Sequence, residues 1–132
     1  MASDFSTPER ALATLEDAYR AKDMNAAVAA KDFRFEAHEL LLNLKNLPER
    51  ADEALIMQTA EVLELAFRKQ IEVNGFPDFA RVRCQVISKT NLRDNLVELM
   101  EECIFPDGGK STQTLHFAKN ESGWHLVVFS PC

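Results

Sequence analysis

The sequence predicts a single α+β domain over residues 1–132, with helices in the first half and a four-stranded antiparallel sheet in the second. Apolar residues recur at helical spacing up to about residue 77, and beyond it β-branched and aromatic residues alternate with polar ones. Short turn-forming segments separate the alternating stretches, which implies that neighbouring strands are antiparallel. A chain of 132 residues can bury one core and is too short for two domains.

Helices are expected at residues 8–21, 24–30, 33–45 and 48–74. The first has a capping side chain before Pro8, and Asp23 can cap the second. The last has the strongest periodic pattern in the chain, and Asn74-Gly75 followed by Pro77 supplies its end. Its apolar side consists of Ile56, Ala60, Leu63, Phe67 and Ile71.

Strands are expected at residues 81–90, 96–105, 112–119 and 124–129, joined by turns at 91–95, 106–109 and 120–123. The register that these turns suggest places Leu99, Phe117 and Leu126 on one apolar face. The opposite face is mixed and either lines a cavity or faces water. It carries Glu98, Met100, Glu102, Thr114, His116 and His125.

The composition excludes several classes of function. With 21 acidic and 15 basic residues the formal net charge is -6, which argues against nucleic acid as a partner because phosphates need clustered lysine and arginine. No apolar run is long enough to span a membrane. Residues 1–10 lack the pattern of a secretory signal, so a cytoplasmic protein is expected.

Three cysteines, Cys84, Cys103 and Cys132, form no CxxC motif. An odd number of cysteines in a reducing compartment predicts free thiols, with Cys84 and Cys103 as small residues of the sheet. Neither a metal site nor a cofactor is expected from this pattern.

The sharpest catalytic hypothesis is an acid–base pair, Glu102 with His116, on adjacent strands. The alternative is a polar cross-strand pair on an exposed face, because spacing alone is weak evidence for catalysis. The candidate residues to line a pocket around this pair are Tyr19, Met100, Glu102, Thr114 and His116.

A charged strip on the last helix is the candidate surface for a protein partner. It consists of Glu61, Glu64, Arg68 and Glu72. The simpler interpretation is a solvated face with a favourable i,i+4 pair between Glu64 and Arg68.

Several segments resemble the nuclear transport factor 2-like superfamily. They are Ala18-Tyr19-Arg20-Ala21-Lys22-Asp23, Lys31-Asp32-Phe33, the strands at 96–105 and 112–119, and the closing segment from Gly123 to Val128. The resemblance implies a curved sheet in a cone-like fold, often with a pocket and often dimeric through the sheet. The superfamily includes isomerases and dehydratases as well as binding proteins, so the fold does not decide the function.

The helical character of residues 33–45 departs from the family enzymes, which commonly continue into a strand after the segment matching Asp32 and Phe33. It resembles the bacterial immunity proteins of this fold, which implies a cognate toxin as the partner. The leading hypothesis is therefore a non-enzymatic protein-binding module. The alternatives are a pocket enzyme using Glu102 and His116, a protein that binds a small hydrophobic ligand, and a homodimer that associates through its sheet.

Overall fold

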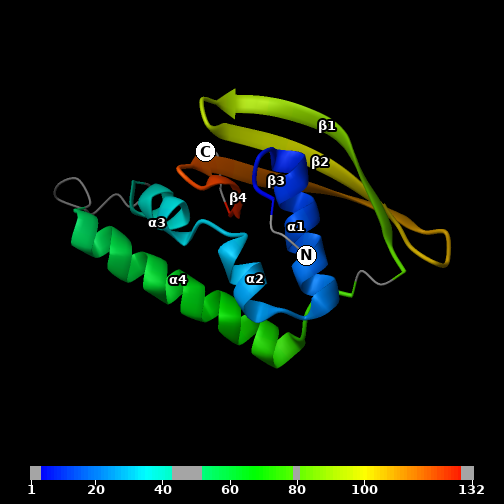
Figure 1. Cartoon of the computed structure of the whole chain (residues 1–132), viewed down its shortest axis with the longest axis horizontal. Coiled ribbons are helices and arrows are strands. Elements are labelled where there is room, and N and C mark those ends of the chain that lie inside the picture. Colours follow the sequence, from blue (N-terminus) through cyan, green and yellow to red (C-terminus); the bar gives the residue numbers. More distant parts are fainter. Residues whose placement is uncertain (1–3, 43–51, 79–80, 129–132) are drawn as a thin grey trace.

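The computed structural model describes residues 4–42, 52–78 and 81–128, and in them it confirms the predicted α+β order. The described helices are α1 (Pro8–Ala21), α2 (Met24–Ala29), α3 (Phe33–Leu42) and α4 (Glu53–Asn74). The strands that follow are β1 (Arg83–Arg93), β2 (Leu96–Ile104), β3 (Lys110–Asn120) and β4 (Gly123–Val127). The sheet arches over α1, while α4 lies along the side of the molecule farthest from β1 (Figure 1).

The caps of α1 explain why its predicted boundaries are confirmed. Thr7 Oγ1 accepts a hydrogen bond from the Arg10 N–H at 3.1 Å, and Pro8 lies in the first turn, where its missing N–H costs nothing. The helix ends where Lys22 adopts a left-handed φ of 55°. The next helix, α2, begins after Asp23, which accepts a hydrogen bond from the Ala26 N–H at 3.1 Å.

The other two helices, α3 and α4, lie on either side of residues 43–51, which are outside the described residues. The predicted end of α3 at residue 45 falls in this range. The prediction that α4 begins near residue 48 is wrong, because Asp52 caps the helix and accepts a hydrogen bond from the Leu55 N–H at 2.7 Å. The predicted end of α4 is confirmed, since Gly75 follows Asn74 with a positive φ of 81°.

The strands form one antiparallel sheet in the order β1-β2-β3-β4. The strand β1 continues to Arg93, so the turn after it is shorter than predicted and consists of Asp94 and Asn95. Asn95 has a φ of 64°, a conformation that asparagine tolerates well in tight turns. The predicted apolar face is confirmed, because Leu99 lies opposite Leu115 and Phe117 lies opposite Leu126.

The inner face of the sheet, which carries Val97, Leu99 and Phe117, packs on Ala11 and Leu12 of α1. Small residues such as Ala11 let the helix approach the sheet closely. Complete burial of a side chain such as Leu99 stabilises a fold by about 1.5–3 kcal/mol. This contact between α1 and the sheet is therefore a main source of stability.

A second apolar cluster joins α3 to α4. It contains Phe33, Ala37 and Leu41 from α3 and Ile56 and Ala60 from α4. Within the described residues, none of the helices is long and apolar enough to cross a membrane.

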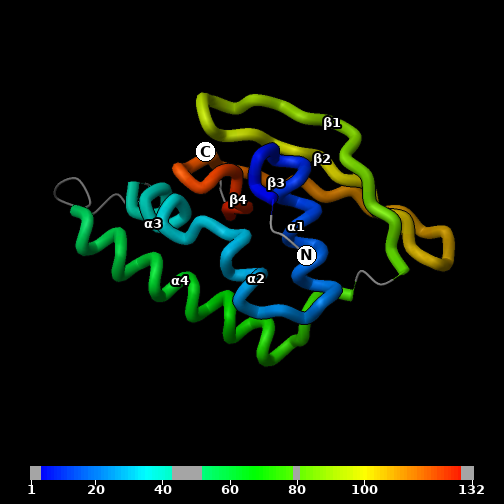
Figure 2. Tube along the Cα trace, in the orientation of Figure 1, coloured from blue at the N-terminus to red at the C-terminus, as the bar shows by residue number. Residues whose placement is uncertain are grey.

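The connection between α2 and α3 ties the helices to the edge of the sheet. Lys31 forms a parallel bridge with Leu126, whose N–H donates to Ala30 O at 2.9 Å. The Asp32 N–H donates to Leu126 O at 3.2 Å. In Figure 2 this connection can be followed past β4 before the chain enters α3.

Candidate functional site

The predicted acid–base pair of Glu102 and His116 is corrected by the register of β2 and β3. His116 lies opposite Glu98, with 3.1 Å between His116 Nε2 and Glu98 Oε2, whereas Glu102 lies opposite Thr112. Glu98 and Glu102 are four residue steps apart along β2, a distance of about 13 Å at the usual rise of a strand. Counting outward from the turn that follows Ile104 gives the same pairing, so the sequence did hold this signal.

The structure does not gather the predicted pocket residues into one site. Met100, Glu102, Thr114 and His116 lie on the outer face of the sheet, opposite to the face that packs on α1. Tyr19 belongs to α1, where its ring centroid is 6.2 Å from that of Phe76 and burial raises its pKa. The body of the sheet therefore separates Tyr19 from the other four.

Neither of the other two histidines, His38 and His125, lies beside His116 in a common site. His125, which was expected on the mixed face, is 5% exposed and stacks on Phe5 with 4.6 Å between the ring centroids. His38 is exposed on α3.

The charged strip on α4 is only partly available to a partner. Arg68 Nε donates to Glu64 Oε2 at 3.0 Å, so these two groups neutralise each other, while Glu61 and Glu72 are exposed. Apolar side chains beside this strip, which the helical pattern did not predict as a contact surface, are exposed as well. Val62, Leu65 and Val73 are 63%, 66% and 68% exposed.

A buried pair of carboxyl groups, also missed from the sequence, joins α1 to the inner face of the sheet. Glu16 of α1 and Glu101 of β2 are 8% and 2% exposed, and their side chains share a hydrogen bond. Burial, and then the neighbouring Glu101 carboxyl, raise the pKa of Glu16 to about 8. At neutral pH Glu16 therefore keeps its proton. Strict alternation along β2 places Glu101 on the same face as Leu99, which is the signal that would have revealed it.

The two sheet cysteines lie beside this acid pair. Cys84 and Cys103 are directly opposite each other in β1 and β2, with their Cα atoms 4.1 Å apart, and a disulfide joins them. The expectation of free thiols is thus corrected for this pair. The antiparallel register brings together two residues that are 19 apart in the chain, which spacing motifs could not show.

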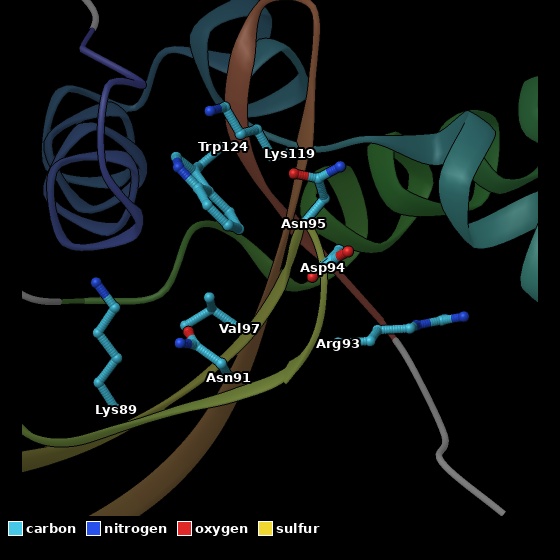
Figure 3. Close-up of a pocket in the computed structure, with 8 residues that line it drawn as sticks. All are labelled: Lys89, Asn91, Arg93, Asp94, Asn95, Val97, Lys119 and Trp124. Atoms are coloured by element: carbon cyan, nitrogen blue, oxygen red, sulfur yellow. The ribbon is translucent and has the colours of Figure 1, made fainter.

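A cavity of about 470 Å³ opens on the inner face next to the turn between β1 and β2. Trp124 and Lys119 lie across it from Lys89 and Asn91, whereas Arg93 extends away from it (Figure 3). Lys119 Nζ is 6.0 Å from the centroid of the Trp124 ring. Arg93 instead forms an ion pair with Glu39.

The lining of this cavity suits a polar or anionic small molecule. Lysine ammonium groups and asparagine amides donate hydrogen bonds, and the Trp124 ring offers an apolar wall. Lys89 Nζ is also 3.5 Å from Glu9 Oε1, an exposed contact that a stronger anion can replace. A smaller cavity of about 300 Å³ shares Lys119 with the first cavity and is also lined by Asp32, Arg34 and His38.

Comparison of the sequence with protein-family models and with curated proteins finds no significant match. Solved structures do match. One is a protein of Thiobacillus denitrificans described as a calcium/calmodulin-dependent protein kinase type II association domain. It is 14% identical, with a TM-score of 0.55, over 93% of this chain and 92% of that one.

Another is a nuclear transport factor 2-like protein of unknown function from Shewanella oneidensis. It is 14% identical, with a TM-score of 0.50, over 89% of each chain. At this identity the likeness concerns the fold, and it agrees with the order of helices and the curved antiparallel sheet described above. The chain has the nuclear transport factor 2-like fold.

Proposed function

We propose that this protein is a non-enzymatic binding module of the cytoplasm, and that the outer side of α4 binds a protein whose contact surface is apolar and basic. The observation that carries the proposal is the exposure of Val62, Leu65 and Val73 on one side of that helix. The resemblance to immunity proteins adds a class of partner, a cognate toxin.

These apolar side chains are not needed by the fold of α4. The helix packs through its other side, where Ile56, Ala60 and Ile71 are buried. An amphipathic helix normally turns charged residues to water, so large apolar residues on its outer side favour a second contact surface.

The charges around the apolar residues favour a basic partner. Glu61 and Glu72 are exposed on α4, and the whole chain carries a formal net charge of -6. Acidic groups at the rim of an interface steer a basic partner and make the association rate fall with added salt.

The test compares two valine-to-aspartate substitutions at equally exposed sites. Val73 on α4 is 68% exposed, and Val128 after β4 is 71% exposed. Wild-type, Val73→Asp and Val128→Asp proteins would each be tagged and isolated from their native cells, and the affinity of any stoichiometric partner would then be measured with purified components.

We expect Val73→Asp to weaken binding by about tenfold or more, which corresponds to about 1.4 kcal/mol. Val128→Asp should bind as the wild type does, and added salt should weaken the wild-type complex. Equal affinity of the two variants, or a partner with an acidic contact surface, would exclude the α4 surface.

A second candidate function is the binding of a small anionic molecule in the cavity shown in Figure 3, which the lysines, asparagines and Trp124 favour. Quenching of Trp124 fluorescence by small organic anions would detect it, because this is the single tryptophan of the chain. Lys119→Gln should weaken such binding, whereas a quench unchanged by this substitution would count against the cavity.

A further inference from the structure

We propose that the inner face of the sheet also carries a metal site: when the Cys84–Cys103 disulfide is reduced, both thiolates and the Glu101 carboxylate bind a Zn²⁺ ion. This site is separate from the α4 surface and from the cavity beside the β1–β2 turn.

The backbone places the three donors together. Cys84 and Cys103 are a directly opposed pair of β1 and β2, and Glu101 precedes Cys103 by two residues, so its side chain is on the same face. One ligand atom from each of the three lies within 4.8 Å of the other two. Ligand atoms around one Zn²⁺ are about 3.5 Å apart, because the bonds are about 2.0–2.3 Å long, so small side-chain rotations suffice.

The donor types favour zinc over calcium or magnesium. Thiolates are soft ligands that bind Zn²⁺ in tetrahedral sites, while Ca²⁺ and Mg²⁺ require sets of oxygen atoms. Cys103 and Glu101 are 5% and 2% exposed and Cys84 is half-buried, so the ion would be partly shielded from water.

Two further side chains support the site. Gln113 Nε2 donates to Glu101 Oε1 at 2.7 Å, the kind of hydrogen bond that orients a ligand carboxylate. Glu16 is hydrogen-bonded to Glu101 and is 8% exposed. Its Oε2 atom is buried without a hydrogen-bond partner in the part of the chain that the structure describes, which leaves a polar group next to the ligand Glu101.

The disulfide makes binding dependent on redox state. A dithiol reductant gives two electrons and two protons to the disulfide, which becomes two thiols, while the reductant becomes a cyclic disulfide. Zn²⁺ then displaces the two thiol protons. In the oxidised protein the same sulfur atoms are bonded to each other and cannot bind the ion as thiolates.

The experiment uses the full chain, reduced and then freed of reductant without oxygen, with Co²⁺ as the probe. Bound Co²⁺ should produce the thiolate-to-cobalt charge-transfer band and the visible bands of tetrahedral coordination, and one equivalent of Zn²⁺ should remove them. Zinc should also raise the Tm of the reduced protein, because a ligand that binds only the native state stabilises it. The oxidised wild type should show none of these changes. It serves as the control because it is folded and has the same sequence as the reduced protein.

Substitutions identify the ligands. Cys84→Ser should abolish the charge-transfer band, whereas Cys132→Ser should keep it. Gln113→Ala should weaken zinc binding by about 10- to 100-fold, as expected for loss of a hydrogen bond to a ligand. Gln85→Ala, which removes the same side chain from an exposed position beside Cys84, should not.

Three results would each overturn the proposal. One is the absence of the charge-transfer band in the reduced wild type. Another is equal zinc affinity of the oxidised and reduced proteins, and the third is unchanged binding by a folded Cys84→Ser variant. None of these measurements involves a protein partner, so a result that overturned the metal site would leave the proposed role of α4 unchanged.

Discussion

Glu16 is a carboxylic acid held in the core beside a second carboxyl group, and it illustrates how one residue couples stability to pH. Its pKa is raised from 4.5 to about 8, first by burial and then by Glu101. Below about pH 4.5 the folded and unfolded chains both carry the proton. Between the two pKa values only the folded chain keeps it, so stability falls as the pH rises through this window.

We therefore expect the oxidised, chelator-treated protein to lose stability between about pH 5 and about pH 8, by at most about 1.4 kcal/mol per pH unit from this one proton. Glu16→Gln should remove this part of the slope, because glutamine does not titrate. Urea midpoints of both proteins across the window measure the effect. Parallel pH profiles would contradict it.

Gly123 is a second residue whose surroundings define its role. Its φ is 111°, a conformation that favours glycine, and an added Cβ would lie 2.9 Å from Phe5 Cβ and collide with the Phe5 carbonyl. The Trp124 N–H donates to that carbonyl oxygen at 2.8 Å, so the backbone cannot move away easily.

We expect Gly123→Ala to destabilise the protein by more than about 1–3 kcal/mol, the usual cost of a strained backbone conformation. Gly108→Ala is the matched control, since Gly108 has a φ of 89° and nothing within 4 Å of an added Cβ. The difference between their unfolding free energies isolates the collision with Phe5. Equal losses would show that no collision occurs.

Among the elements, α4 depends on its N-terminal cap. The apolar side of α4 contacts α3. The backbone N–H groups in the first turn of α4 have no carbonyl of the same helix to which they can donate a hydrogen bond. Asp52 satisfies one of them at Leu55 and also places a negative charge at the positive end of the helix dipole.

Asp52→Ala should therefore cost about 1 kcal/mol of unfolding free energy, while Asp52→Asn should retain most of the stability because asparagine caps nearly as well. Urea denaturation followed by circular dichroism measures both. If alanine and asparagine behaved alike, the side-chain cap would not be stabilising α4.

At the scale of the whole molecule, Lys31 connects the helices to the sheet. Its backbone bridges to Leu126, and its ammonium group forms an ion pair with Glu36 at 2.9 Å. The two side chains are 5% and 8% exposed, and Lys31 Nζ lies 5.2 and 5.1 Å from the ring centroids of Phe33 and Phe67. The backbone of Lys31 thus contacts β4, while its side chain contacts α3 and α4.

Removing one member of this pair leaves a buried charge alone, so Lys31→Met should cost about 3–5 kcal/mol. The double variant Lys31→Met with Glu36→Leu should recover much of that loss, because no charge remains buried. A double-mutant cycle of unfolding free energies measures the coupling. Additive losses would mean that the two groups do not stabilise each other.

The sequence by itself determined the local structure. The cap at Thr7 and Pro8, the apolar side of residues 56–71 and the turns after Ile104 and Asn120 are local signals, and each gave the correct element or nearly so. Alternation also predicted the apolar face with Leu99 and Phe117, because the side-chain period of a strand does not depend on the rest of the chain.

Only the tertiary structure decided which distant residues meet. The packing of the elements joined Cys84 of β1 to Cys103 of β2 and brought Glu16 of α1 against Glu101 of β2. Packing also decided that Val62, Leu65 and Val73 remain exposed on α4. Contacts between residues far apart in the chain depend on how whole elements pack, and helical or strand periodicity cannot specify that packing.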